Sequence, residues 1–129
     1  MRKLGIREGD RVTVLSAPPG FALEWPAGVA VTRRLPAKTD VVLFFTKSRD
    51  QLGRQIDRLG QAVAPDGTIW VAWPKRASKV ATDMTEDVVR EVALPVGLVD
   101  NKVCAIDEVW SGLKLVWRKE LRTPTSPGG

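Results

Sequence analysis

Residues 64–83 read APDGTIWVAWPKRASKVATD, and this stretch decides the fold of the chain. Its Pro-Asp-Gly turn leads into a short apolar strand, Thr68–Trp73, which ends abruptly at Pro74. A loop rich in cations and hydroxyls follows and leads into a helix. In open α/β sheets, ligands bind just beyond the carboxyl ends of the strands. The stretch therefore predicts an open α/β sheet with a ligand site at the carboxyl end of this strand.

Composition and charge restrict the class of protein. The 129 residues suffice for one domain, for which we expect residues 1–121, followed by a loose tail at residues 122–129. No apolar run has the length of a membrane span, and the charged N-terminus lacks the apolar segment of a secretory signal. We therefore expect a cytoplasmic protein. The net charge of +5 permits anionic ligands or nucleic acid, but acidic residues interleave with the basic ones.

Missing residue types exclude several kinds of chemistry. The chain has no histidine, which excludes histidine-based acid–base catalysis and histidine metal ligation. Its single cysteine, Cys104, excludes an intrachain disulfide and a multi-cysteine zinc site. No dense cluster of carboxylates suggests a metal site of another kind, so we predict none. Whether the protein is an enzyme stays open.

The hydrophobic pattern predicts strands that alternate with helices. The clearest helix begins at Ser48, which has a glutamine three residues on, at the spacing of a capping box. Leu52, Ile56, Leu59 and Val63 then recur four, three and four positions apart and form one apolar stripe. Strands are expected at residues 11–16, 29–32, 40–45, 68–73, 98–106 and 113–119.

The remaining elements complete the predicted fold. A second long helix is expected after the cap-like pair Asp83 and Glu86, and a short helix at residues 21–25. Because no helix separates the last two strands, they should form an antiparallel pair. The strand that begins at Leu113 would then be an edge able to pair with a second copy in a homodimer. The predicted fold class is a three-layer α/β structure around a twisted sheet, mostly parallel and ending in this antiparallel pair.

Two resemblances accompany this pattern. The helix-Pro-Gly-strand passage at residues 59–71 resembles the end of a class I methyltransferase domain, which implies a Rossmann-like fold and S-adenosylmethionine as the cofactor. That family carries a glycine-rich turn after its first strand and an acidic residue at the end of its second. This chain has Ser16–Gly20, with a single glycine, and Thr32–Arg34, which is basic. The chain is also shorter by about one strand–helix unit, so the resemblance implies a truncated build with a degraded cofactor loop.

The second resemblance covers nearly the whole length. The chain is similar to a small bacterial domain family of unknown function in four passages, at residues 15–20, 73–78, 82–86 and 107–114. This resemblance implies a Rossmann-like fold and a bacterial cytosolic setting, and it implies no activity.

Candidate site residues lie in the loops expected at the carboxyl edge of the sheet. Lys75, Arg76 and Ser78 offer cations and a hydroxyl for a phosphate or carboxylate, unless they form a solvated basic loop. Pro19 and Gly20 either form a rigid rim where backbone approaches a ligand or simply end a strand.

Further candidates come from other loops at the same edge. Arg49 has no evident structural duty and is expected to face the crevice, and Trp73 and Trp110 are candidates for stacking on a flat ligand. Asp107 and Glu108 are adjacent carboxylates that could supply a general base, or could pair with nearby lysine and arginine.

Two functions remain open. The first is the binding of a small anionic or nucleotide-like ligand at the carboxyl edge, without a residue assigned to S-adenosylmethionine. The second is a non-enzymatic basic module that binds nucleic acid or an acidic protein partner.

Overall fold

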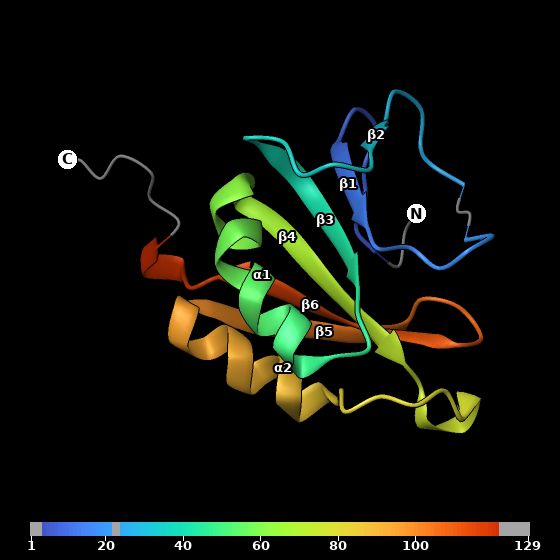
Figure 1. Ribbon diagram of the computed structural model, residues 1–129. Coiled ribbons are helices and arrows are strands. Elements are labelled where there is room, and N and C mark those ends of the chain that lie inside the picture. The colour runs from blue at the N-terminus through green and yellow to red at the C-terminus, as the bar shows by residue number, and fades with distance from the viewer. Residues whose placement is uncertain (1–3, 22–23, 122–129) are drawn as a thin grey trace.

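The computed structural model describes residues 4–21 and 24–121, which form a six-stranded mixed sheet in the order β2-β1-β3-β4-β6-β5 (Figure 1). The strands are β1 Arg11–Leu15, β2 Ala30–Thr32, β3 Thr39–Phe45, β4 Val63–Pro74, β5 Leu98–Ala105 and β6 Trp110–Trp117. The helices are α1 Arg49–Ala62 and α2 Glu86–Ala93, with 3-10 turns η1 Arg76–Ser78, η2 Leu94–Val96 and η3 Lys119–Leu121.

Strand directions agree with the predicted topology, with one correction. β1 pairs in parallel with β2 and β3, β3 pairs in parallel with β4, and β6 is antiparallel to β4 and β5. The mostly parallel sheet with an antiparallel pair is therefore confirmed. The expectation that the strand near Leu113 forms an edge is wrong, because β6 lies between β4 and β5. The edges are β2 and β5, and the register of β5 shifts between Asp100 and Lys102.

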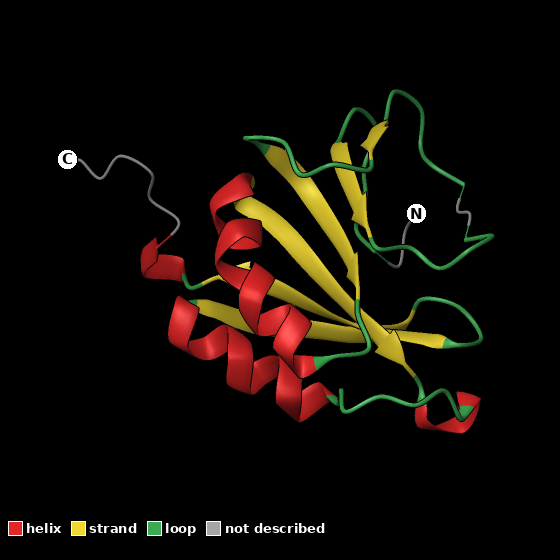
Figure 2. Cartoon of the chain, in the orientation of Figure 1, coloured by secondary structure: helices red, strands yellow, loops and turns green. Residues whose placement is uncertain are grey.

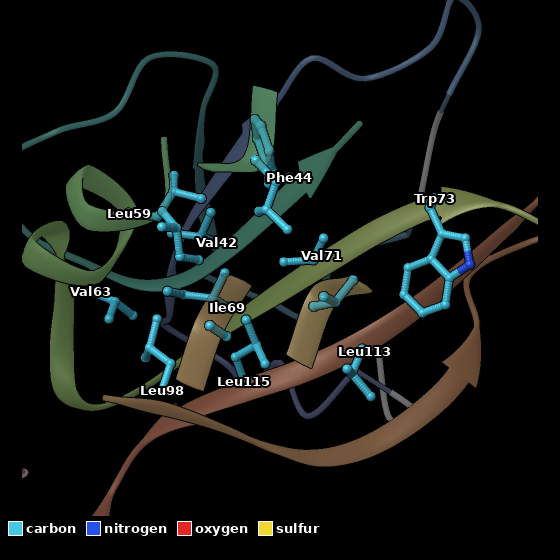
Figure 3. Packing of buried hydrophobic residues seen from close by; sticks show 14 of the residues in the cluster. Val42, Phe44, Leu59, Val63, Ile69, Val71, Trp73, Leu98, Leu113 and Leu115 are labelled. Carbon is cyan, nitrogen blue, oxygen red and sulfur yellow. The ribbon is translucent and has the colours of Figure 1, made fainter. Parts of the chain in front are cut away.

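Both α-helices cover the same face of the sheet (Figure 2). The predicted stripe of Leu52, Ile56 and Leu59 is at most 3% exposed and packs there with the strands. Figure 3 shows the alternate residues of β3 and β4 that line this face, among them Val42 and Ile69. The helix face thus holds the larger apolar cluster, since every second residue of a strand points to the same side.

Irregular chain covers the opposite face. A second cluster there includes Phe45 and Trp70, and Leu4 and Ile6 from the N-terminal segment pack onto it. The fully buried Trp70 donates a hydrogen bond from Nε1 to the backbone oxygen of Leu4 at 2.9 Å. The third layer is therefore built of loops.

Two expectations reach beyond the described part of the chain. In the short helix expected at residues 21–25, residues 22–23 lie outside the described residues, and residues 21, 24 and 25 are not helical. The expected tail at residues 122–129 also lies outside them.

Local hydrogen bonds set where the helices begin. Ser48 caps α1 as predicted, because its side chain accepts a bond from the Gln51 backbone N–H at 3.2 Å. The predicted start of α2 is wrong: Thr85, not Asp83, caps it, by accepting a bond from the Val88 N–H at 3.1 Å. Asp83 instead bonds to the N-terminus of α1, because its Oδ1 accepts a hydrogen bond from the Arg49 N–H at 2.9 Å.

β4 begins at Val63, five residues earlier than the sequence pattern predicts. The segment before Thr68 extends along the start of β3, where the register shifts between Thr39 and Val41. Gly67 permits this course, because a Cβ at this position would lie 2.5 Å from the backbone oxygen of Asp40. Within the described ranges, no helix is long and apolar enough to cross a membrane.

The two glycines of α1 give a matched test of the packing. Gly53 has open space around its Cα, so Gly53→Ala should stabilise the protein by about 0.5–1 kcal/mol, the usual gain in a helix. At Gly60 a new Cβ would lie 2.9 Å from Cζ2 of Trp117, so the ring must move. Gly60→Ala should therefore stabilise less than Gly53→Ala or destabilise, as measured by urea unfolding. Equal stabilisation by both would contradict the packing.

An ion pair between β1 and β3 predicts a dependence of stability on pH. Arg11 Nη2 lies 3.0 Å from Asp40 Oδ1, and the Arg11 backbone N–H donates to Oδ2 at 2.8 Å. Hydrogen bonds from the Arg11 side chain, above all, lower the pKa of Asp40 from its ordinary value, although partial burial opposes them. The stability contributed by this carboxylate is therefore complete above its unfolded pKa and is lost as pH falls through the lower folded value.

Thermal unfolding of Asp40→Asn tests this linkage. The variant should melt at a lower temperature than the parent near pH 7, and the difference should shrink as the pH falls toward about 3. A difference that is constant across this range would show that the charge of Asp40 plays no part.

Candidate functional site

The carboxyl ends of β1, β3 and β4 meet at one edge of the sheet, because these strands are parallel. From β1 the chain goes to β2 on one side, and from β3 it goes to β4 on the other. The crevice between the ends of β1 and β3 is therefore the topological switch point, where open α/β sheets bind ligands. Gly20, Arg49 and Lys75 each follow one of these strands at this edge.

A cavity of about 510 Å³ opens at the switch point. We call it the switch-point pocket. It is bounded by the end of β1, the chain after β2, one residue of β3 and the side of α1 that carries Gln51, Gln55 and Arg58. Its lining residues are Leu15, Ser16, Arg33, Arg34, Leu35, Phe44, Gln51, Gln55 and Arg58.

Hydrogen-bond donors dominate the polar lining of the switch-point pocket. The guanidinium groups of Arg33, Arg34 and Arg58 carry positive charge at any physiological pH. The side-chain oxygen of Gln51 accepts a bond from Thr46 Oγ1 at 2.6 Å, and that of Gln55 accepts one from Arg58 Nη1 at 2.9 Å. Both amides therefore keep their N–H groups for other partners. None of the described residues that line this pocket is a carboxylate.

Backbone strain marks the end of β1. Ser16 has a φ of 58°, in the left-handed region that costs a non-glycine residue about 1–2 kcal/mol. In the described part of the chain, only Ser16 and Lys79 among non-glycine residues have positive φ, and each lines a pocket at the carboxyl edge. Strained residues concentrate at binding sites, where the surrounding structure holds them in place.

A second cavity, of about 440 Å³, lies between the end of β4 and the start of α2. This β4–α2 pocket is lined by residues between Trp73 and Glu86, and it brings together Trp73 and Arg76 of the predicted site. Its loop is tied to α1, since Thr82 Oγ1 donates to the backbone oxygen of Lys47 at 2.7 Å. Trp73 is only 7% exposed and belongs to the core on the helix face, so little of its ring is open for stacking.

Other predicted residues near β4 make structural bonds. Ser78 Oγ donates to the backbone oxygen of Lys75 at 2.7 Å, and the Lys75 N–H donates to the backbone oxygen of Val109 at 2.8 Å. The Arg49 guanidinium lies 3.6 Å from a carboxylate oxygen of Glu91 on α2.

The remaining predicted residues lie apart from both pockets. Asp107 Oδ1 accepts bonds from the N–H groups of Val109 and Trp110, both at 2.8 Å, and so holds the turn between β5 and β6. Trp110 is 7% exposed and packs edge-to-face on Phe45, with ring centroids 5.1 Å apart. Glu108 lines neither pocket. Pro19 and Gly20, in the loop after β1, also lie outside the lining of both pockets.

Sequence reasoning missed most of the switch-point pocket. The basic pair Arg33 and Arg34 was visible as a departure from the methyltransferase pattern, but it was not assigned to a site. Arg58 lies outside the predicted apolar stripe of its helix, and only the tertiary fold brings it to the chain after β2. The described residues contain no cluster of three or more side chains able to hold a metal ion.

No protein-family model matches this chain, and neither does any curated protein. The similarity to a small bacterial family therefore stays a prediction.

Solved structures do match. A SAM-dependent methyltransferase from Aquifex aeolicus aligns with a TM-score of 0.59 and 13% identity, over 88% of this chain and 85% of that one. Magnesium protoporphyrin IX methyltransferase from Synechocystis PCC 6803, with bound SAM, gives 0.59 and 12%, over 86% and 71%. Fibrillarin from Methanococcus jannaschii, a pre-rRNA processing protein, gives 0.57 and 12%, over 86% and 67%. The likeness at these identities is one of fold: the chain has a methyltransferase-like, Rossmann-like α/β build.

Proposed function

We propose that this protein binds a small anionic, nucleotide-like ligand in the switch-point pocket. The observation that carries the proposal is the lining itself, in which Arg33, Arg34 and Arg58 surround a cavity without a carboxylate among its described lining residues. Arginine matches phosphate and carboxylate oxygens with paired hydrogen bonds, and such charge-assisted bonds are about twice as strong as neutral ones. A ligand rich in acceptors satisfies this arrangement.

The cofactor of the related folds fits this lining less well. Structures with the same build hold S-adenosylmethionine, which carries a cationic sulfonium. This chain places Arg33 and Arg34 after β2 and the strained Ser16 after β1. The two arginines repel a cation, and their guanidinium groups offer hydrogen-bond donors only. We therefore propose an anionic nucleotide as the ligand, in place of S-adenosylmethionine.

We propose that the switch-point pocket binds its ligand without catalysing a reaction on it. A general base must lie within hydrogen-bond reach of the proton that it removes. The polar groups of the switch-point pocket are guanidinium groups, amides and the Ser16 hydroxyl, none of which is a general base at neutral pH.

The β4–α2 pocket is the second candidate for this ligand. Its Arg76 and Lys79 resemble the site expected from the sequence. Glu86 also lines it, however, and this carboxylate forms an ion pair with Arg90 of α2. The lining of the β4–α2 pocket thus has two cationic residues and one carboxylate, whereas that of the switch-point pocket has three cationic residues and no carboxylate. The nucleic-acid alternative gains no added support from the ion pairs. Arg11, Arg49 and Arg90 are each paired with a carboxylate, so these described basic side chains are less available to phosphate groups.

Binding assays with a defined panel test the proposal. We expect AMP, ADP or NADP⁺ to raise the melting temperature, with about 2.7 kcal/mol of stabilisation at a hundredfold excess over the dissociation constant. S-adenosylmethionine should give a smaller shift. Arg33→Ala plus Arg34→Ala should weaken the best ligand at least about tenfold in calorimetry, because each charge-assisted bond is worth about 1.5–3 kcal/mol.

The matched control is Lys75→Ala plus Arg76→Ala, which removes the same charge from the other side of the edge. Retained affinity in this control, together with loss in the Arg33/Arg34 variant, assigns the ligand to the switch point. The opposite pattern would move it to the β4–α2 pocket. An absence of binding by every panel member would refute the proposed function.

A further inference from the structure

The switch-point pocket continues along the flank of α1. A cavity of about 380 Å³ lies between the chain after β2, at Leu35, Pro36 and Ala37, and the last turns of α1. Leu35 and Arg58 line both cavities, so the two form one groove. We call it the α1 groove. It lies on the sheet face that carries the helices, beside β1 and β2, which no helix of the described chain covers (Figure 2).

The α1 groove is longer than a single phosphate requires. Its helix side runs from Gln51 to Ala62, which at 1.5 Å per residue is about 16 Å. Each of its two halves is within the size range of a small-molecule site, about 300–1,000 Å³. A ligand that used only Arg33 and Arg34 would leave the half beside Gln61 empty.

The arginines are divided between the two halves of the groove. Arg33 and Arg34 line only the first half, and Arg58 lines both halves, where they join. Gln55 and Arg58 are three residues apart on the same side of α1, and the bond from Arg58 Nη1 to the Gln55 side chain fixes the guanidinium at the junction. This bond leaves Arg58 further N–H donors for a ligand.

The opposite wall gives the groove an apolar side. Leu35, Pro36 and Ala37 present carbon surface across from Arg58 and Gln61. This wall lies beside and beyond Arg58, so a ligand held by Arg33, Arg34 and Arg58 needs a further group beyond Arg58 to fill this half of the groove.

We infer that the ligand of this site is elongated and carries two separated phosphate groups, as a phosphorylated dinucleotide does. One phosphate lies on Arg33 and Arg34, the second lies on Arg58, and the rest of the molecule extends toward Gln61. This inference rests on the proposed function and adds the substrate class to it. A longer single strand is disfavoured, because Phe44, the aromatic side chain that lines the groove, is only 2% exposed and offers no stacking platform.

Calorimetry with AMP and with the 5′-phosphorylated dinucleotide pApA tests the inference. We expect the unmodified protein to bind pApA at least about tenfold more tightly than AMP, since a second charge-assisted contact forms. Gln61→Glu adds a negative charge at the exposed far end of the groove. It should weaken pApA at least about fivefold and AMP less than about twofold.

The matched control is Arg54→Gln, which makes the same change of charge at an exposed position of α1 that lines neither half of the groove. It should change the affinity for either probe less than about twofold, and thermal unfolding should show that both variants fold.

Each outcome separates the two proposals. If pApA binds no more tightly than AMP, or if Gln61→Glu affects both probes alike, the elongated ligand is wrong. The proposed function would still stand if the Arg33/Arg34 variant abolishes AMP binding. If an oligoadenylate of eight nucleotides binds more tightly than pApA, with a steep dependence on salt, the inference is overturned in favour of single-stranded nucleic acid.

Discussion

Parallel pairing of β1 with β3 is the constraint on which the rest of the structure depends. Val12 opposite Val41 and Val14 opposite Leu43 align the two strands, so both end at the same edge of the sheet. The chain then leaves them in opposite directions, which opens the crevice that the switch-point pocket occupies. The buried side chains of these strands hold that alignment on both faces, because a slip of one residue would exchange the faces.

The uncovered flank of the sheet is the feature that gives this fold its particular groove. α1 and α2 pack over β3, β4, β5 and β6, and beside β1 the chain after β2 runs as a loop past α1 (Figure 1). A groove between a helix and a loop can be lined by side chains from both. Here the loop supplies the arginine pair and apolar carbon, and the helix supplies the amides and Arg58.

Local signals in the sequence were sufficient to predict the strands, the two long helices and much of the sheet topology. The cap at Ser48 and the apolar stripe that follows it depend on neighbours in sequence and on hydrophobicity alone. Long-range contacts account for what was missed. Asp83 looks like a helix cap in sequence, yet it caps α1 from a loop 34 residues away, and Arg58 meets Arg33 and Arg34 only after folding.

Anion binding at the ends of β1 and β2 is the proposal on which the elongated ligand also depends. The most direct measurement is a titration of ¹⁵N-labelled protein with AMP, followed by amide chemical shifts. We expect the largest changes on Ser16, on residues 33–35 and on the side-chain amides of Gln51 and Gln55. Changes confined to residues 76–86, or no changes at saturating AMP, would contradict it.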